Sequence, residues 1–134
     1  SYNFVPKEQF ETMKRNGCFA ESDTFRDQYY GSSIDRVKRV LADSHGILAL
    51  TPRGAAAVYK LRHEINLKFV VLKAGEELLR KNLFRRGVTD TQKQNQVIEE
   101  HGRFELPTEI PNQRFFLTGG EEDKKLLAYL ETII

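Results

Sequence analysis

The chain has 134 residues, of which 40% are hydrophobic and 30% charged, and its formal net charge is +2. This length is enough for one domain or most of one, and the composition is that of a soluble globular protein and argues against a disordered chain. The near balance of 21 basic and 19 acidic residues gives no general case for nucleic acid or an acidic membrane as partner, so any anion site must be local.

The first part of the chain predicts a small lobe of short elements. We expect a strand over residues 2–5, ended by Pro6, and a helix over 7–16 with Phe10 and Met13 on one face. Residues 18–21 and 24–30 alternate loosely between apolar and polar, as paired antiparallel strands do. Apolar residues at spacings of three and four then predict a helix over 33–43.

The stretch Gln28-Tyr29-Tyr30-Gly31-Ser32-Ser33 leads into that helix. Gly31 can take a backbone conformation that a Cβ would penalise, and Ser32 or Ser33 can cap the helix. The free N–H groups of the helix N-terminus and the phenol of Tyr30 suit an anion. Taken alone, this pattern favours an ordinary strand–turn–helix junction, and a phosphate-recognition corner is the alternative.

The pattern changes after residue 46. The continuous apolar run over 47–50 predicts a buried parallel strand, and Thr51-Pro52 predicts a helix start. Further strands are expected over 67–72 and 114–117, with helices over 53–63, 75–84, 90–101 and 121–134. This alternation indicates an α/β fold with an open parallel sheet. The polar segment 85–103 reads as a flap.

Other candidate chemistry is limited. The three histidines are widely spaced and form no metal-ligand motif. Cys18 is the only cysteine, so it permits no internal disulfide, and we expect it to pack in the small lobe. No apolar run is long enough to cross a bilayer, and the polar start with Lys7 and Glu8 shows no signal peptide, so we expect a cytoplasmic location.

Four segments resemble the guanylate kinase family in order and spacing: Tyr2-Asn3-Phe4-Val5, Phe10-Glu11-x-Met13, Phe19-x-Glu21 and Tyr29-Tyr30-Gly31-Ser32. The resemblance covers essentially the whole chain, 1–134. It implies a P-loop nucleotide-kinase-like fold, with a small antiparallel acceptor-binding lobe over 1–32 and a core over 33–134. In that core, helices flank an open parallel sheet and the flap lies at about 85–103.

The resemblance also implies a site for GMP or a phosphopeptide. Tyr2 and Tyr30 correspond to phosphate-contacting tyrosines, Glu21 to the acid that reads the guanine edge, and Ser32 to a residue reaching the base, with Gly31 between them. A carboxylate can accept from two guanine N–H groups, and phenols can donate to phosphate. In the flap, Arg86 matches one family arginine and Arg85 adjoins it. The basic cluster that contains these two arginines favours a solvated helix end, and a phosphate contact by Arg85 and Arg86 is the alternative.

The catalytic half departs from the family pattern. The family's kinases carry Asp-x-Asp where this chain has Ala49 and Thr51, and glutamine where it has Arg53. No G-x-x-x-x-G-K-[ST] occurs, so the chain lacks the P-loop and the first strand, which lies centrally in the family's sheet. Either the domain is cropped, or a second chain supplies the strand, or the sheet has rearranged.

We therefore expect a non-catalytic guanylate-kinase-like protein-interaction module that binds peptides, including phosphopeptides, and binds GMP weakly. It would need no cofactor and no metal, and neighbouring domains would bring it peripherally to a membrane or junction. The alternative is the C-terminal part of an ATP-dependent guanylate kinase whose P-loop lies upstream or on another chain, with ATP and Mg²⁺ as requirements. A purely structural role is the third hypothesis.

Overall fold

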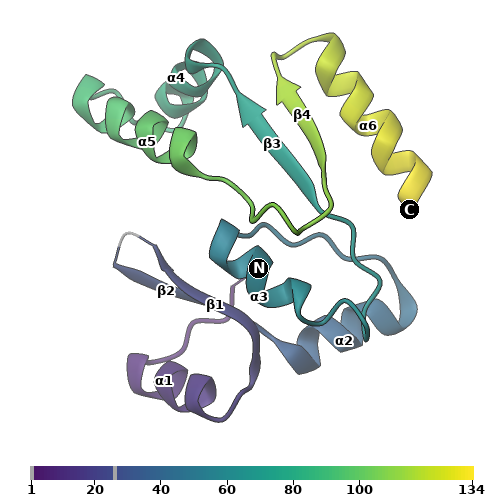
Figure 1. Ribbon diagram of the computed structural model, residues 1–134. Coiled ribbons are helices and arrows are strands. Elements are labelled where there is room, and N and C mark those ends of the chain that lie inside the picture. The colour runs from purple at the N-terminus through teal and green to yellow at the C-terminus, as the bar shows by residue number, and fades with distance from the viewer. Residues whose placement is uncertain (1, 26) are drawn as a thin grey trace. The chain divides into compact units, whose positions relative to one another are not determined.

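Six helices and four strands form within residues 2–25 and 27–134, the part of the chain that the computed structural model describes (Figure 1). They are divided between two compact units, Ser1–Leu67 and Lys68–Ile134. One unit holds an antiparallel pair of strands and the other a parallel pair. This content confirms the predicted α/β class, and the division into a lobe over 1–32 and a core over 33–134 stays a prediction.

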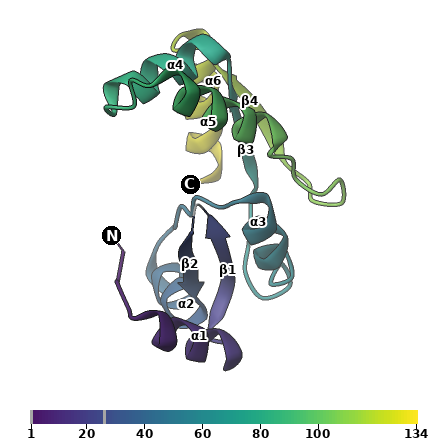
Figure 2. The same cartoon turned by 90° about the vertical axis from the view of Figure 1, so that its left-hand side faces the viewer.

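The first unit is built around an antiparallel hairpin. Its elements, in order, are α1 (Lys7–Arg15), β1 (Phe19–Phe25), β2 (Gln28–Ser33), α2 (Ile34–Asp43) and α3 (Pro52–Tyr59). Figure 2 shows α1 below the hairpin and α3 beside β1. The helices lie close to where the sequence predicts them, because their caps and apolar spacings are local signals.

An aromatic cluster joins α1 to one face of the hairpin. Phe10 of α1 is 7% exposed, and its ring centroid lies 4.7 Å from that of Phe19 and 5.7 Å from that of Tyr29. Gly31 belongs to this contact: a Cβ there would lie 2.8 Å from two ring carbons of Phe19. Our conformational explanation for Gly31 was wrong, because its φ is not positive; the close approach of the Phe19 ring explains the glycine.

Two predicted strands are absent from the described residues. Residues 2–6 and 45–51 form neither helix nor strand, and Ile47 is 87% exposed. A strand is stable only when its backbone groups pair with a neighbour, and neither segment has a ladder partner in the part of the chain described. The prediction that Cys18 packs in the lobe was also wrong, since this residue is exposed.

The second unit contains β3 (Val70–Ala74), α4 (Glu76–Arg85), α5 (Thr91–Arg103), β4 (Gln113–Leu117) and α6 (Glu121–Ile133). β3 and β4 pair in parallel, from Val70 opposite Gln113 to Ala74 opposite Leu117. A parallel pair needs a crossover connection, and α4 and α5 supply it. α6 packs on β4, where the ring centroids of Phe115 and Tyr129 lie 5.6 Å apart.

The segment predicted as a flap consists mostly of helix α5, which packs against α4. Arg80 of α4 donates to Gln94 Oε1 at 3.3 Å and to Asn95 Oδ1 at 2.6 Å, and Gln94 is 8% exposed. Gln94 Nε2 also donates to the carbonyl of Val88 at 2.8 Å. Polar side chains therefore bind the two helices together, which explains how so polar a segment is ordered.

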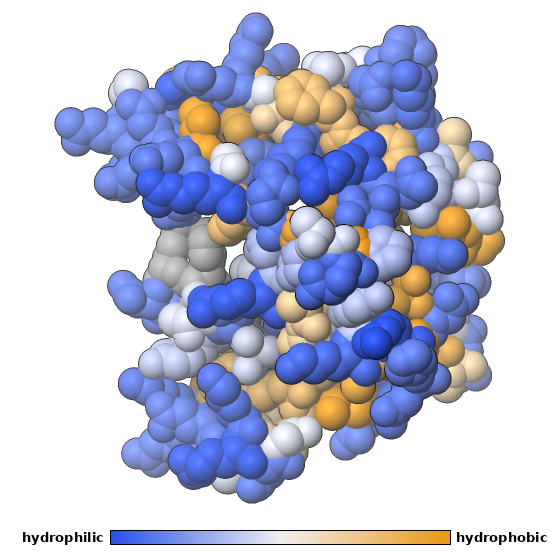
Figure 3. Space-filling view, viewed as in Figure 1, coloured by the Kyte–Doolittle hydropathy of each residue, from blue (hydrophilic) through white to orange (hydrophobic). Residues whose placement is uncertain are grey.

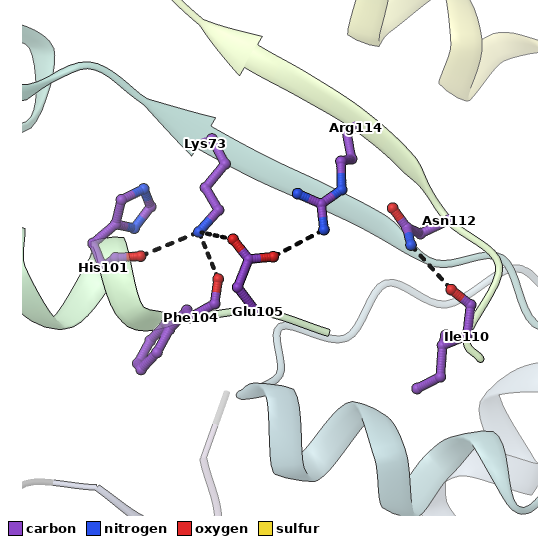
Figure 4. Close-up of polar contacts among 7 residues, drawn as sticks. All are labelled: Lys73, His101, Phe104, Glu105, Ile110, Asn112 and Arg114. Carbon is purple, nitrogen blue, oxygen red and sulfur yellow. Dashed lines mark hydrogen bonds and ion pairs between the residues drawn. The ribbon is translucent and has the colours of Figure 1, made fainter. Parts of the chain in front are cut away.

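A lysine ties the end of α5 to β3 (Figure 4). Lys73 Nζ lies 2.5 Å from the carbonyl oxygen of Phe104, 3.3 Å from that of His101 and 3.6 Å from a carboxylate oxygen of Glu105. The last carbonyl groups of a helix lack intrahelical partners, and Lys73 supplies donors to this end. The hydrogen bond from Arg114 and the charge of Lys73 hold the pKa of Glu105 below its ordinary value.

The face of the chain in Figure 3 is mostly hydrophilic, with scattered hydrophobic patches. Large exposed apolar side chains occur in both units, among them Phe4 (95%) and Phe84 (64%). Among the described residues, no helix has both the length and the apolar character needed to cross a membrane.

Candidate functional site

The hairpin face opposite the aromatic cluster carries the predicted polar site. In the antiparallel ladder Glu21 pairs with Ser32, and Asp23 pairs with Tyr30. Paired residues lie on the same face, and residues two apart in a strand share a face. The hairpin therefore gathers two carboxylates, one hydroxyl and one phenol on one surface, which we call the acceptor face: Glu21, Asp23, Tyr30 and Ser32.

Glu21 is the buried acid of this face. Glu21 is 8% exposed, and Ser32 Oγ donates a 2.7 Å hydrogen bond to Glu21 Oε1. Within residues 2–25 and 27–134, no group donates a hydrogen bond to the other oxygen, Oε2. A carboxylate has about four lone-pair sites. Glu21 is thus held in place and still able to accept hydrogen bonds from a ligand.

Helix α3 begins beside Glu21. Thr51 Oγ1 accepts a 3.1 Å hydrogen bond from the amide of Gly54, and Pro52 occupies the first turn, which confirms the predicted helix start. A Cβ added to Gly54 would lie 3.0 Å from Glu21 Oε2. The glycine therefore lets the carboxylate approach the N-terminal turn of the helix, where the partial positive charge favours an anion.

Asp23 connects the hairpin to the same helix start. Asp23 Oδ2 accepts from Thr51 Oγ1 at 2.5 Å, and Oδ1 accepts from the amide of Thr24 at 2.8 Å and pairs with Arg53 Nη2 at 2.6 Å. Burial by itself raises the pKa of the Asp23 carboxyl. The hydrogen bonds from Thr51 and the Thr24 amide, with the charge of Arg53, outweigh burial and hold that pKa below its ordinary value.

Tyr2 and Tyr30 lie together at the solvent edge. Their ring centroids are 6.0 Å apart in an edge-to-face arrangement, and the residues are 74% and 39% exposed. Tyr30 extends the acceptor face from its place opposite Asp23. A phosphate contact by these phenols stays a prediction, but both hydroxyl-bearing rings are accessible to a ligand.

The structure separates the roles of the two serines. Ser33 Oγ accepts a 3.2 Å hydrogen bond from the amide of Arg36 and so caps α2, whereas Ser32 binds Glu21. Five predicted site residues, Tyr2, Glu21, Tyr30, Gly31 and Ser32, therefore belong to the hairpin or contact it.

Arg85 and Arg86 belong to the second unit, where Arg85 ends α4 and Arg86 caps it. Arg85 Nη2 donates to Asn82 Oδ1 at 3.2 Å. Their predicted phosphate contact remains a prediction. No group of three or more His, Cys, Asp or Glu side chains that could hold a metal ion occurs in the part of the chain described.

From the sequence, Thr51 was predicted as a helix cap and noted as a departure from the family pattern, Arg53 was noted only as a departure, and Asp23 was not singled out. One signal for Asp23 was available, because a residue two positions after Glu21 in a strand shares its face. No local pattern shows that Thr51, 28 positions away, bonds to Asp23.

A guanylate kinase family model matches residues 1–106 of the chain. The guanylate kinase of Chlorobium chlorochromatii is 32% identical over 107 residues, which cover 79% of this chain and 56% of that protein. The guanylate kinase of Saccharophagus degradans is 36% identical over 91 residues, which cover 67% of this chain and 44% of that protein. The chain spans about half the length of the curated relatives it matches.

Proposed function

Because this chain belongs to the guanylate kinase family, we propose that it is a non-catalytic binding module whose acceptor face receives a phosphorylated peptide and retains weak affinity for GMP. The observation that carries this proposal is the state of Glu21. Its carboxylate is buried and fixed by Ser32, yet no group of the described residues donates a hydrogen bond to Oε2, and the same face carries Tyr30.

Such a face is suited to ligands that combine N–H donors with a phosphate. The Glu21 carboxylate accepts from N–H groups, whether they come from a guanine edge or from a peptide. The phenols of Tyr2 and Tyr30 are donors for phosphate oxygens. Recognition of phosphorylated segments usually relies on arginine forks. Arg85 and Arg86 belong to the second unit and stay separate candidates for a phosphate contact.

Two features support the absence of catalysis. The positions at which the family resemblance places two aspartates hold Ala49 and Thr51. Asp23, a carboxylate in contact with Thr51, already accepts hydrogen bonds from Thr51 and Thr24 and pairs with Arg53. Phosphoryl transfer depends on charges placed around the transferred group, so we expect binding without turnover and without any requirement for ATP or Mg²⁺.

The test is a titration of the protein with matched phosphoserine and serine peptide libraries, and with GMP, monitored by heteronuclear NMR. We expect the phosphorylated library and GMP to shift the amide signals of the acceptor face, and Glu21→Gln to weaken GMP binding. The exposed-surface variant Asp43→Asn serves as the charge-matched control. Equal shifts with both libraries would refute the phosphate-dependent part of the proposal.

A nucleotide kinase is the second candidate, favoured by the finding that the relatives are guanylate kinases and about twice as long as the matched region. In that case this chain is the acceptor-binding part of a longer enzyme. A coupled assay of ADP formation from ATP, GMP and Mg²⁺, carried out on the complete gene product, decides between the two. Turnover that depends on GMP would overturn the non-catalytic proposal.

A further inference from the structure

A continuous series of contacts runs from Asp23 to Glu21 through the start of α3. Asp23 Oδ2 accepts from Thr51 Oγ1 at 2.5 Å, and the same hydroxyl oxygen accepts from the Gly54 amide at 3.1 Å. Gly54 in turn lies against Glu21, since a Cβ there would lie 3.0 Å from Oε2. The hydrogen bond between Asp23 and Thr51 therefore links β1 to the first turn of α3, beside Glu21.

We propose that Asp23 is a positioning residue of the acceptor face: by holding Thr51, it fixes the first turn of α3 against Glu21 and so sets how well Glu21 accepts hydrogen bonds from a ligand. This inference rests on the proposed function, because it concerns the same face. It assigns to Asp23 an indirect role, through Thr51 and Gly54, and no contact with the ligand.

The hydrogen bonds of Asp23 support an indirect role. Both of its oxygens are occupied by groups of the chain, and its side chain is only 11% exposed. Glu21 differs, because Oε2 has no donor among the described residues. Of two neighbouring carboxylates on one face, the first is thus available to a ligand and the second is committed to the scaffold.

The Thr51 contact should matter more than the Arg53 contact. The Arg53 side chain is 79% exposed, and ion pairs at such exposed sites contribute little because water screens them. The hydroxyl of Thr51 is part-buried and also caps the helix, so its loss disturbs both the cap and the link to β1. Removing the Thr51 hydroxyl should therefore weaken ligand binding more than removing the Arg53 charge.

The placement of the Glu21 carboxylate can be measured by comparing ligands that present different numbers of N–H donors. The guanine edge carries an exocyclic amino group next to a ring N–H, whereas hypoxanthine has the ring N–H but no amino group. A well-placed carboxylate can bind both donors of guanine, and a displaced one loses the second. The ratio of the affinities for GMP and IMP is therefore a measure of the placement of Glu21.

The experiment measures the dissociation constants of GMP and IMP by NMR titration for the wild type, Asp23→Asn, Thr51→Val, Thr51→Ser and Arg53→Gln. Asn has nearly the volume of Asp but places an N–H₂ group where one oxygen stood. Val is close to Thr in shape and lacks the hydroxyl, and Ser restores it. Asp43→Asn, an exposed change in α2, is the control for the loss of one negative charge.

We expect Asp23→Asn and Thr51→Val to weaken GMP binding about tenfold and to reduce the preference for GMP over IMP. Thr51→Ser and Asp43→Asn should keep the wild-type preference, and Arg53→Gln should change it least among the site variants. A general loss of folded protein would weaken both ligands equally and leave their ratio unchanged.

An unchanged ratio in both Asp23→Asn and Thr51→Val overturns this inference while leaving the proposed function standing. A wild-type protein that binds neither GMP nor IMP shows instead that the GMP part of the proposed function is wrong, and the inference is overturned with it. A variant that fails to fold is recognised by its amide spectrum, and the remaining variants then decide the outcome.

Discussion

Replacement of Gly31 by alanine tests the packing that supports the acceptor face. The added methyl carbon would lie 2.8 Å from Cδ1 and Cε1 of Phe19 and 3.2 Å from Cγ. At 2.8 Å two carbon atoms overlap, so the Phe19 ring must move. The ring cannot turn away freely, because Phe10 is buried against it with a centroid separation of 4.7 Å.

The expected loss of stability follows from two opposing effects. Forcing one methyl group into a filled contact costs about 1–3 kcal/mol. Alanine also restricts the unfolded chain more than glycine does, which stabilises the folded state by about 0.4–1 kcal/mol where the backbone conformation is compatible. Gly31 does not have a positive φ, so this gain applies, and Gly31→Ala should be less stable by about 1–2 kcal/mol.

Urea unfolding, monitored by circular dichroism, measures this change in the free energy of unfolding. Gly102→Ala in α5 is the matched control, because nothing lies within 4 Å of its added Cβ, and this variant should be more stable by about 0.5–1 kcal/mol. Phe19→Leu should reduce the cost of Gly31→Ala when both are present, since the smaller side chain vacates the contact. A Gly31→Ala protein as stable as the wild type would refute the packing argument.

Three further predictions concern both units. Burial and the charge of Lys73 hold the pKa of His101 below 6.5. The stability that this neutral imidazole contributes is therefore fully present above pH 6.5 and is lost as the pH falls from there through the lowered pKa. Urea unfolding of the wild type between pH 7.5 and 5 should show this loss of stability, and the loss should be smaller in His101→Gln. Lys73→Met should destabilise the protein by about 1–3 kcal/mol, because it removes the hydrogen bonds that the ammonium group donates to the carbonyls of residues 101 and 104; hydrogen exchange at the end of α5 should rise, and unchanged exchange would contradict this role. Gly54→Ala should change the free energy of GMP binding more than the free energy of unfolding, because its Cβ would lie 3.0 Å from Glu21 Oε2. Calorimetric titration and urea unfolding of the same samples measure these two free energies.

The helices and the hairpin were predictable because their signals are local. Thr51-Pro52 predicts the start of α3, and the structure shows the predicted cap on Gly54. Glu21 and Ser32 pair across the predicted antiparallel strands, which places their side chains on the same face of the hairpin. Side-chain spacing along a few residues is enough to determine such features.

The strand predicted over 47–50 was wrong for a physical reason that no local pattern contains. An apolar run indicates that a segment is suited to burial, but a strand forms only where a neighbour supplies backbone hydrogen bonds. Residues 45–51 have no such neighbour in the part of the chain described. Val70–Ala74 has a similar apolar character and forms a strand, because Gln113–Leu117 pairs with it.

The sequence by itself determined the family, the helix starts and the identity of the polar residues on the hairpin, since each depends on residue type at short spacing. Only the tertiary structure decided that Asp23 bonds to Thr51, that the Phe19 ring requires Gly31, and that no described residue donates a hydrogen bond to Oε2 of Glu21. These facts depend on distances between side chains that are far apart in the chain or on opposite strands. Packing fixes such distances, and residue spacing along one strand or helix does not.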